Sequence, residues 1–184
     1  MAVRPVPLNS VYAPTNTDLI FILTQKLQNK PIPFDQVLHL DLYSNHPSTL
    51  LHNIQPAIKQ TQEHVIYTPR YRVKGSSTQI TRRVLGGKVG IWKQVSDFGY
   101  ICEILGENAI GREMRFVFYE GDVDDVGVVR KTDWCMTEFI TLNEDEGGFA
   151  ICKVGEDAAR AANGADMGRE DELDRMFSKG RKWG

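Results

Sequence analysis

From residue 64 onward the chain is a succession of short runs of β-branched and aromatic residues, a pattern that narrows the possible folds considerably. Stretches rich in Gly, Asn and Asp separate the runs, for example Gly106-Glu107-Asn108. This pattern predicts antiparallel strands joined by hairpins and loops. The expected strands cover residues 64–68, 90–95, 100–105, 114–119, 134–140 and 149–154.

The helical signal is confined to the front of the chain. In residues 15–27 the apolar side chains recur on one face, Thr15 can cap the first turn, and Asp18 follows three residues later near the positive end of the helix dipole. Pro31 and Pro33 end this helix, and a short second helix is expected over residues 35–40. Helices followed by a series of strands predict an α+β fold rather than alternating βαβ units.

A chain of 184 residues is long enough for one domain with a proper core. We expect an N-terminal arm over residues 1–10, a folded domain over residues 11–154 and a tail over residues 155–184. The tail is poor in large apolar residues and rich in charge, which predicts a disordered or marginally helical segment. No apolar run approaches the 18 or so residues of a membrane-spanning helix, and the N-terminus lacks the apolar core of a secretory leader.

Charge is distributed unevenly along the chain. Between residues 64 and 96 there is no Asp or Glu, but there are seven bases, whereas the whole chain carries a net charge of -2. Removing the +7 of this segment leaves the rest near -9, so a basic element is carried by an otherwise acidic protein. Such an element can face a polyanion, or its bases can pair with acids elsewhere in the fold. The seven bases are Arg70, Arg72, Lys74, Arg82, Arg83, Lys88 and Lys93.

No group of residues predicts catalysis or metal binding, and we expect a protein that is not an enzyme and takes no cofactor. The glycine-rich residues 86–90 lack the spacing of a phosphate-binding loop and lead into a strand, not a helix. The histidines lack metal-binding spacing. Cys102, Cys135 and Cys152 fall inside apolar segments without CxxC spacing, which favours buried, reduced thiols.

Four short motifs, at residues 14–19, 37–43, 63–72 and 90–93, occur in the first half of the chain. In this order they resemble the NAC domain of plant transcription factors. Pro14-Thr15 with Asp18-Leu19 is similar to the family's PTDEEL helix start. VLHLDLY at residues 37–43, followed by Pro47 and Leu50, resembles EVDLYxxxPWDL. EHVIYTPRYR at residues 63–72 is similar to EWYFFxPRDRK, and GIWK at residues 90–93 stands where the family has GYWKATG.

The second half continues the resemblance in the same order. Ile110-Gly111, FVFYEG at residues 116–121 and KTDWCMTEF at residues 131–139 resemble IGxKKTLVFYxG…KTDWVMHEY. FAICKV at residues 149–154 is similar to the closing WVLCRIF. The resemblance therefore spans about residues 11–154 and implies a twisted antiparallel β-sheet flanked by a few N-terminal helices.

The resemblance also implies a function: a nuclear, dimeric regulator that binds double-stranded DNA in a sequence-specific manner. The strand that contains Trp92 and Lys93 would lie at a sheet edge and enter the major groove, which exposes base edges, while Arg and Lys meet phosphates. We expect Trp92 in the core and Gln94 as a reader of adenine. The candidate DNA-binding residues are Arg70, Arg72, Lys74, Arg82, Arg83, Lys88, Lys93, Gln94, Arg112 and Arg115.

Departures from the family pattern predict weaker DNA binding. Where the family has WKATGKDK, this chain has WKQVSDFG, which loses bases and adds Asp97 and the bulky Val95 and Phe98. Glu113 and Met114 replace paired lysines, although Arg112 and Arg115 adjoin them. Each lost phosphate contact reduces the magnitude of the slope of log affinity against log salt concentration by about 0.9.

The dimer interface departs from the family as well. It is expected at Val11, Tyr12 and Asp18, where the family's Arg-Glu pair maps onto Val11 and Asp18 and so loses one charge. The chain is expected to form a homodimer or a heterodimer with other NAC proteins, and neither a membrane nor a small-molecule substrate is expected. The alternative is an interaction module of the NAC fold that pairs with other NAC proteins without strong DNA binding.

Overall fold

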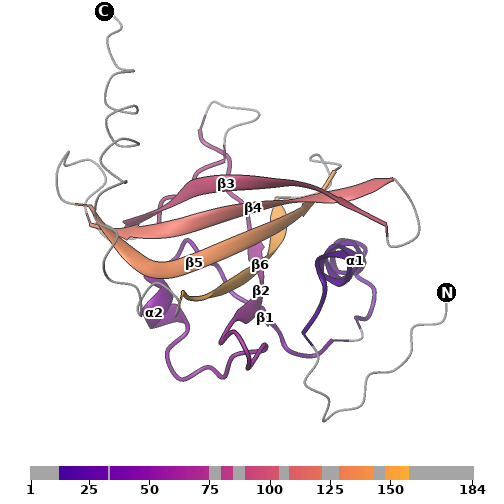
Figure 1. The fold of residues 1–184 in the computed structure, drawn as a ribbon, viewed down its shortest axis with the longest axis horizontal. Helices are drawn as coiled ribbons and strands as arrows, with labels where there is room; N and C mark the ends of the chain where they lie inside the picture. The colour runs from indigo at the N-terminus through magenta and orange to yellow at the C-terminus, as the bar shows by residue number, and fades with distance from the viewer. Residues whose placement is uncertain are drawn as a thin grey trace, which may run out of the picture.

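A computed structural model describes residues 13–32, 34–74, 80–84, 90–103, 108–121, 129–142 and 148–157, with only the backbone described at Asp97 and Phe98. Within these residues, two helices, α1 (Asn16–Leu27) and α2 (Pro47–Leu50), accompany one six-stranded sheet. The strands are β1 (Val37–His39), β2 (His64–Pro69), β3 (Gly90–Cys102), β4 (Ala109–Glu120), β5 (Arg130–Thr141) and β6 (Phe149–Glu156). Their order across the sheet is β1-β2-β6-β5-β4-β3, and every pair is antiparallel except the parallel pair β1–β2 (Figure 1).

Helix α1 begins as the sequence predicts. The Thr15 hydroxyl accepts a hydrogen bond from the Asp18 amide, and the Asp18 carboxylate accepts one from the Thr15 amide, so the two residues form a capping box. This satisfies two backbone donors that the first turn would otherwise leave unpaired. The buried side of the helix consists of Leu19, Ile20, Ile22 and Leu23.

The prediction of a helix over residues 35–40 is wrong, because residues 37–39 form β1. Six residues are too few to hold a helix without tertiary packing. Here the competing partner is β2: Val37 pairs with Val65, His39 pairs with Tyr67, and the Leu40 amide donates to the Tyr67 carbonyl. The second helix is instead α2, with His46 as its N-cap and Pro47 in its first turn.

Strand β3 joins two strands that the sequence predicts separately. It runs from residue 90 to residue 102, and its register against β4 shifts at three places, between Gln94 and Ser96, between Asp97 and Gly99, and between Ile101 and Cys102. Gly99 has a φ of 93°, which glycine adopts readily and other residues do not. Bulges of this kind twist an edge strand and disfavour pairing with a further strand.

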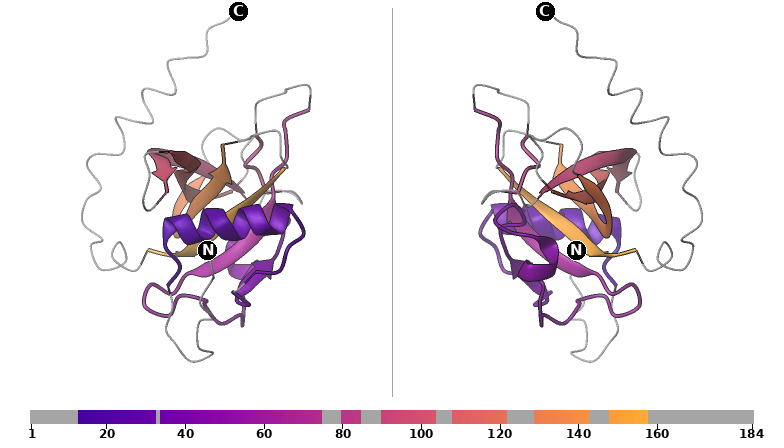
Figure 2. Two further views of the ribbon diagram at one scale, coloured as in Figure 1. Left: turned by 90° about the vertical axis from the view of Figure 1, so that its right-hand side faces the viewer. Right: turned by 90° about the vertical axis from the view of Figure 1, so that its left-hand side faces the viewer.

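The two faces of the sheet pack against different parts of the chain. On one face, here named the α2 face, Trp92, Phe116 and Met136 pack with Tyr43 and neighbouring residues around α2. On the other, the α1 face, Phe139 and Ile151 pack against α1, which lies across this side of the sheet in Figure 2. Gly111 permits this contact, because a Cβ there would overlap Ile20.

Strand β6 extends two residues past residue 154, where the sequence predicts the end of the domain. Its last residue, Glu156, pairs with Trp134. The arm over residues 1–10 and residues 158–184 of the tail lie outside the described residues. Within the described residues no helix is long and apolar enough to cross a membrane.

Candidate nucleic-acid interface

Strand β3 lies at the edge of the sheet and holds the residues that the resemblance places in the DNA groove. Trp92 is buried, as the sequence predicts, and its ring lies 5.1 Å from that of Phe118 on the α2 face. Lys93 pairs in register with Val117 and so faces the opposite side, where its Nζ lies 4.3 Å from the centre of the Tyr119 ring. Gln94 is exposed. The strand is therefore anchored by one aromatic side chain and presents its polar residues outward.

A short extended segment, residues 80–84, flanks the start of β3. The Trp92 amide donates to the Arg82 carbonyl over 3.0 Å, and the Val84 amide donates to the Gly90 carbonyl over 3.0 Å. The other side of this segment contacts residues 71–74, since the Thr81 amide donates to the Tyr71 carbonyl over 2.8 Å. Residues 71–74, residues 80–84 and the start of β3 thus lie side by side, whereas β2, the first part of the basic segment, lies near the other edge of the sheet. Beyond Trp92, no strand among the described residues covers the outer edge of β3.

Two bases of this segment are directed inward. Arg70 Nε lies 2.8 Å from Glu138 Oε1, and Arg82 Nη2 lies 2.9 Å and 2.8 Å from the two carboxylate oxygens of Glu138. The Glu138 side chain is fully buried, and those of Arg70 and Arg82 are only 11% and 12% exposed. The Arg82 guanidinium also lies over the Phe116 ring. Both guanidinium groups are therefore held inside the fold by one carboxylate, Glu138.

Glu138 gives a sequence signal that is visible only in retrospect. It alternates with Met136 and Ile140 on the α2 face of β5, so a charged residue stands at a core position of a central strand. A buried carboxylate requires a partner. The acid-free basic segment contains the two partners, Arg70 and Arg82.

The other bases of the segment are placed differently. Arg72, Lys74 and Arg83 are exposed and lie in the two extended stretches beside β3. Lys88 lies outside the described residues. Together with Lys93 and Gln94, the three exposed bases form the part of the candidate set that the fold brings to the β3 edge; we call these five residues the edge set.

Arg112 and Arg115 lie on β4, further from this edge set. Arg112 pairs with Tyr100 and lies five residues along β4 from Val117, the partner of Lys93, or about 17 Å at the rise of a strand. Arg115 shares the side of Lys93, and its Nη2 lies 3.2 Å from Asp157 Oδ2. It borders a polar hollow of about 500 Å³ on the α1 face. Arg115 is therefore partly neutralised, and Arg112 is remote from Lys93.

The candidate dimer residues are only partly described. Val11 and Tyr12 lie outside the described residues. The Asp18 carboxylate accepts hydrogen bonds from the Thr15 amide over 2.9 Å and from the Thr15 hydroxyl over 2.7 Å, so it serves the helix start. Nearby, Asn16 Nδ2 donates to Glu113 Oε2 over 2.6 Å, which ties Glu113 to the beginning of α1.

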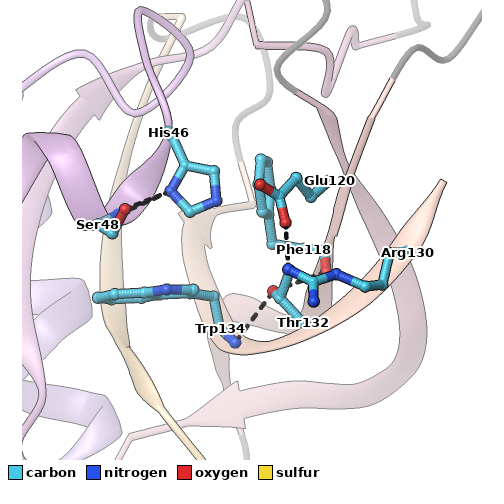
Figure 3. A network of polar contacts seen from close by, with 7 residues as sticks. All are labelled: His46, Ser48, Phe118, Glu120, Arg130, Thr132 and Trp134. Atoms are coloured by element: carbon cyan, nitrogen blue, oxygen red, sulfur yellow. Dashed lines mark hydrogen bonds and ion pairs between the residues drawn. The ribbon is translucent and has the colours of Figure 1, made fainter.

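Figure 3 shows polar contacts around Phe118, the residue whose ring packs against that of Trp92. The Ser48 amide donates to His46 Nδ1, and the His46 ring contacts the Phe118 ring edge-on at 4.9 Å. Burial lowers the pKa of His46, which favours the neutral ring. The hydrogen bond from Arg130, 2.8 Å long, lowers the pKa of Glu120. The Phe118 ring contacts both His46 and Trp92, so it links the His46 ring to the buried side chain that anchors β3.

The cysteines differ from the expectation of buried thiols. Cys152 is buried, Cys135 is half-buried and Cys102 is exposed at the end of β3. Burial, with the nearby charge of Glu138, raises the pKa of Cys152 well above its ordinary value. Cys102 follows the last register shift of an edge strand, where no other strand among the described residues covers it. The described residues contain no cluster of His, Cys, Asp or Glu that could hold a metal ion.

Comparisons with known proteins place the chain in a family. A family model described as No apical meristem (NAM) protein matches residues 7–141. The chain is 35% identical over 129 residues to the "Putative NAC domain-containing protein 94" of Arabidopsis thaliana. That alignment covers 70% of this chain and 36% of the relative, so the chain spans about a third of the relative's length. With the predicted segments, the mostly antiparallel sheet and the edge strand in place, the chain belongs to the No apical meristem, or NAC-domain, family.

Proposed function

We propose that this protein is a nuclear transcription regulator that binds double-stranded DNA in a sequence-specific manner through the edge of β3. Membership of the NAC family suggests a transcription regulator. The observation that carries the DNA-binding proposal is the position of Trp92 and Lys93 on an edge strand, with Arg72, Lys74 and Arg83 exposed beside it. A β-edge fits the major groove, and flanking bases can contact phosphates.

The roles within this interface follow from placement. Lys93 and Arg83 are proposed to contact phosphates on either side of the groove, with Arg72 and Lys74 further along the backbone. Gln94 is exposed next to Lys93 and is proposed to read an adenine edge, since an amide can donate and accept together. Lys88 remains in the proposed set by its position in the sequence. Arg112 and Arg115 are proposed as minor contacts.

Binding is expected to be weaker than is usual for the family, because WKQVSDFG replaces WKATGKDK and because Glu113 and Met114 replace paired lysines. In addition, Arg70 and Arg82 both pair with the buried Glu138, so two of the seven basic side chains are directed into the fold. If these two arginines contact no phosphate, the slope of log affinity against log salt concentration is smaller in magnitude by about 1.8 than for a surface on which all seven bases contact phosphates. Dimerisation, through the N-terminal segment with Val11, Tyr12 and Asp18, is proposed to offset part of this loss by bringing two edges to one DNA.

The same observation favours one second candidate function. A NAC-fold module that pairs with other NAC proteins and modulates them would tolerate a reduced basic surface. In that case the N-terminal segment would be retained for pairing while the β3 edge contacts DNA weakly.

Selection from a randomised DNA pool at low and at physiological salt separates the two. Sequence enrichment that depends on salt, and that Arg83→Ala and Lys93→Ala each weaken, supports direct DNA binding. No retention above an acidic control protein, together with hetero-dimerisation with another NAC protein, supports the interaction module.

A further inference from the structure

Glu138 occupies an unfavourable place for a charge. It lies on the central strand β5, inside the apolar cluster of the α2 face, and its side chain has no exposed surface. Replacing a buried ion pair by apolar residues is often neutral or stabilising, so stability alone does not account for such a carboxylate. Its two oxygens are instead joined to two separate segments of the chain, through Arg70 and Arg82.

The two segments are also held by other contacts: the Tyr71 hydroxyl donates to Asp41 Oδ2 over 2.8 Å, Arg83 forms a bridge with Ile91, and Val84 is buried in the apolar cluster of the α2 face. Residues 71–74 and 80–84 are joined by a single bridge between Arg72 and Ile80 and by the Thr81 amide donating to the Tyr71 carbonyl. Neither is a regular strand of the sheet. To these contacts the ion pairs with Glu138 add a direct link from Arg70 and from Arg82 to β5.

Arg82 connects Glu138 with strand β3. Its guanidinium binds Glu138, and its carbonyl accepts from the Trp92 amide over 3.0 Å. The exposed Arg83 follows directly, and Lys93 follows Trp92. A displacement of Arg82 would therefore move both of the bases proposed to contact phosphates.

We propose that Glu138, acting through Arg82, is a positioning residue that sets the geometry of the β3 edge for DNA, rather than a residue that serves stability alone. The inference rests on the proposed function but has a consequence that needs no DNA. Loss of the Glu138 charge should free residues 80–84 from β3 while the sheet stays folded.

Hydrogen exchange, measured residue by residue on the full chain, tests that consequence. Glu138→Gln keeps the shape of the side chain and removes its charge. The matched control is Asp157→Asn, which removes the charge of the Arg115–Asp157 pair on the α1 face. We expect Glu138→Gln to accelerate exchange of the Trp92 and Val84 amides at least tenfold, with little change at amides between β5 and β6. Equal protection of Trp92 in both variants would overturn the proposal.

The second test measures DNA affinity. It uses Arg82→Met, a variant that leaves Glu138 in place. A positioning role predicts that Arg82→Met weakens binding at least tenfold without changing the slope of log affinity against log salt. Arg83→Ala, a phosphate contact, should reduce that slope by about 0.9. A slope reduced by Arg82→Met as much as by Arg83→Ala would show that Arg82 contacts DNA directly and would refute the positioning role.

The two arms separate the failure of the inference from that of the proposed function. If the unaltered chain does not bind DNA, the proposed function fails, and hydrogen exchange at Trp92 still decides whether Glu138 positions the edge. If Glu138→Gln does not fold, Arg82→Met is examined by the same exchange measurement, with the same expected acceleration at Trp92 and the same contrary result.

Discussion

Gly111→Ala tests how helix α1 sits on the sheet. A Cβ at residue 111 would overlap the Cδ1 of Ile20 and lie 2.7 Å from the Ile140 carbonyl oxygen, both closer than real contacts. Overpacking of this kind costs about 1–3 kcal/mol of unfolding free energy. The helix must therefore move away from β4, or the variant must bear that strain.

A double-mutant cycle with Ile20→Val assigns the cost to this contact. Ile20→Val alone should destabilise by about 0.5–1.5 kcal/mol, because it leaves a small cavity. In the double variant the new methyl group occupies part of the space that Cδ1 leaves, so the two effects should fall short of their sum by about 1 kcal/mol. Denaturant unfolding followed by circular dichroism measures all four free energies.

Gly99→Ala is the matched control for this cycle. A Cβ at residue 99 meets nothing within 4 Å, but the φ of 93° is strained for alanine. Ile20→Val should therefore add to Gly99→Ala without compensation. Simple additivity with Gly111→Ala, or a Gly111→Ala variant as stable as the parent, would refute the packing of α1 described above.

Two further predictions concern the β3 anchor and the pH dependence of folding. Trp92→Ala should cost about 3–5 kcal/mol of unfolding free energy, and Trp92→Phe distinctly less, because the ring contact with Phe118 is kept; equal losses in denaturant unfolding would argue against the anchor. Burial lowers the pKa of His64, so the native state favours the neutral ring. The stability linked to this neutral ring is fully present above the unfolded pKa of about 6.5, and it is lost as the pH falls through the lower folded pKa. His64→Gln should flatten the decline in melting temperature between pH 7 and pH 5, and an unchanged decline would contradict this assignment.

The sequence predicts most of the sheet because the strand signal is local. Alternating apolar residues and glycine-rich separators place β2, β4, β5 and β6 without tertiary information. Thr15 and Asp18 likewise mark the start of α1 in the sequence. The edge position of β3 was expected from the family resemblance, and its pairing with β4 alone among the six strands confirms it.

The errors arise where long-range contacts decide the outcome. Residues 37–39 become a strand because β2 offers a parallel partner 28 residues away in sequence, as the pairing of Val37 with Val65 shows. The continuity of β3 through Gly99 depends on β4 running alongside it. Arg70 and Arg82 pair with Glu138, which lies 68 and 56 residues further along the chain. A count of charges in the sequence cannot detect these pairs, so it assigns to the surface two bases that lie in the core.

The slope of log affinity against log salt for the unaltered chain and for an Arg83→Ala, Lys93→Ala double variant, on a DNA site selected from the random pool, tests the central claim most directly. If the β3 edge contacts DNA, the double variant should lose about 1.8 from this slope, because each base neutralises one phosphate. An unchanged slope, with the variant still folded, would mean that DNA is bound elsewhere or not at all, and the account of the β3 edge would be contradicted.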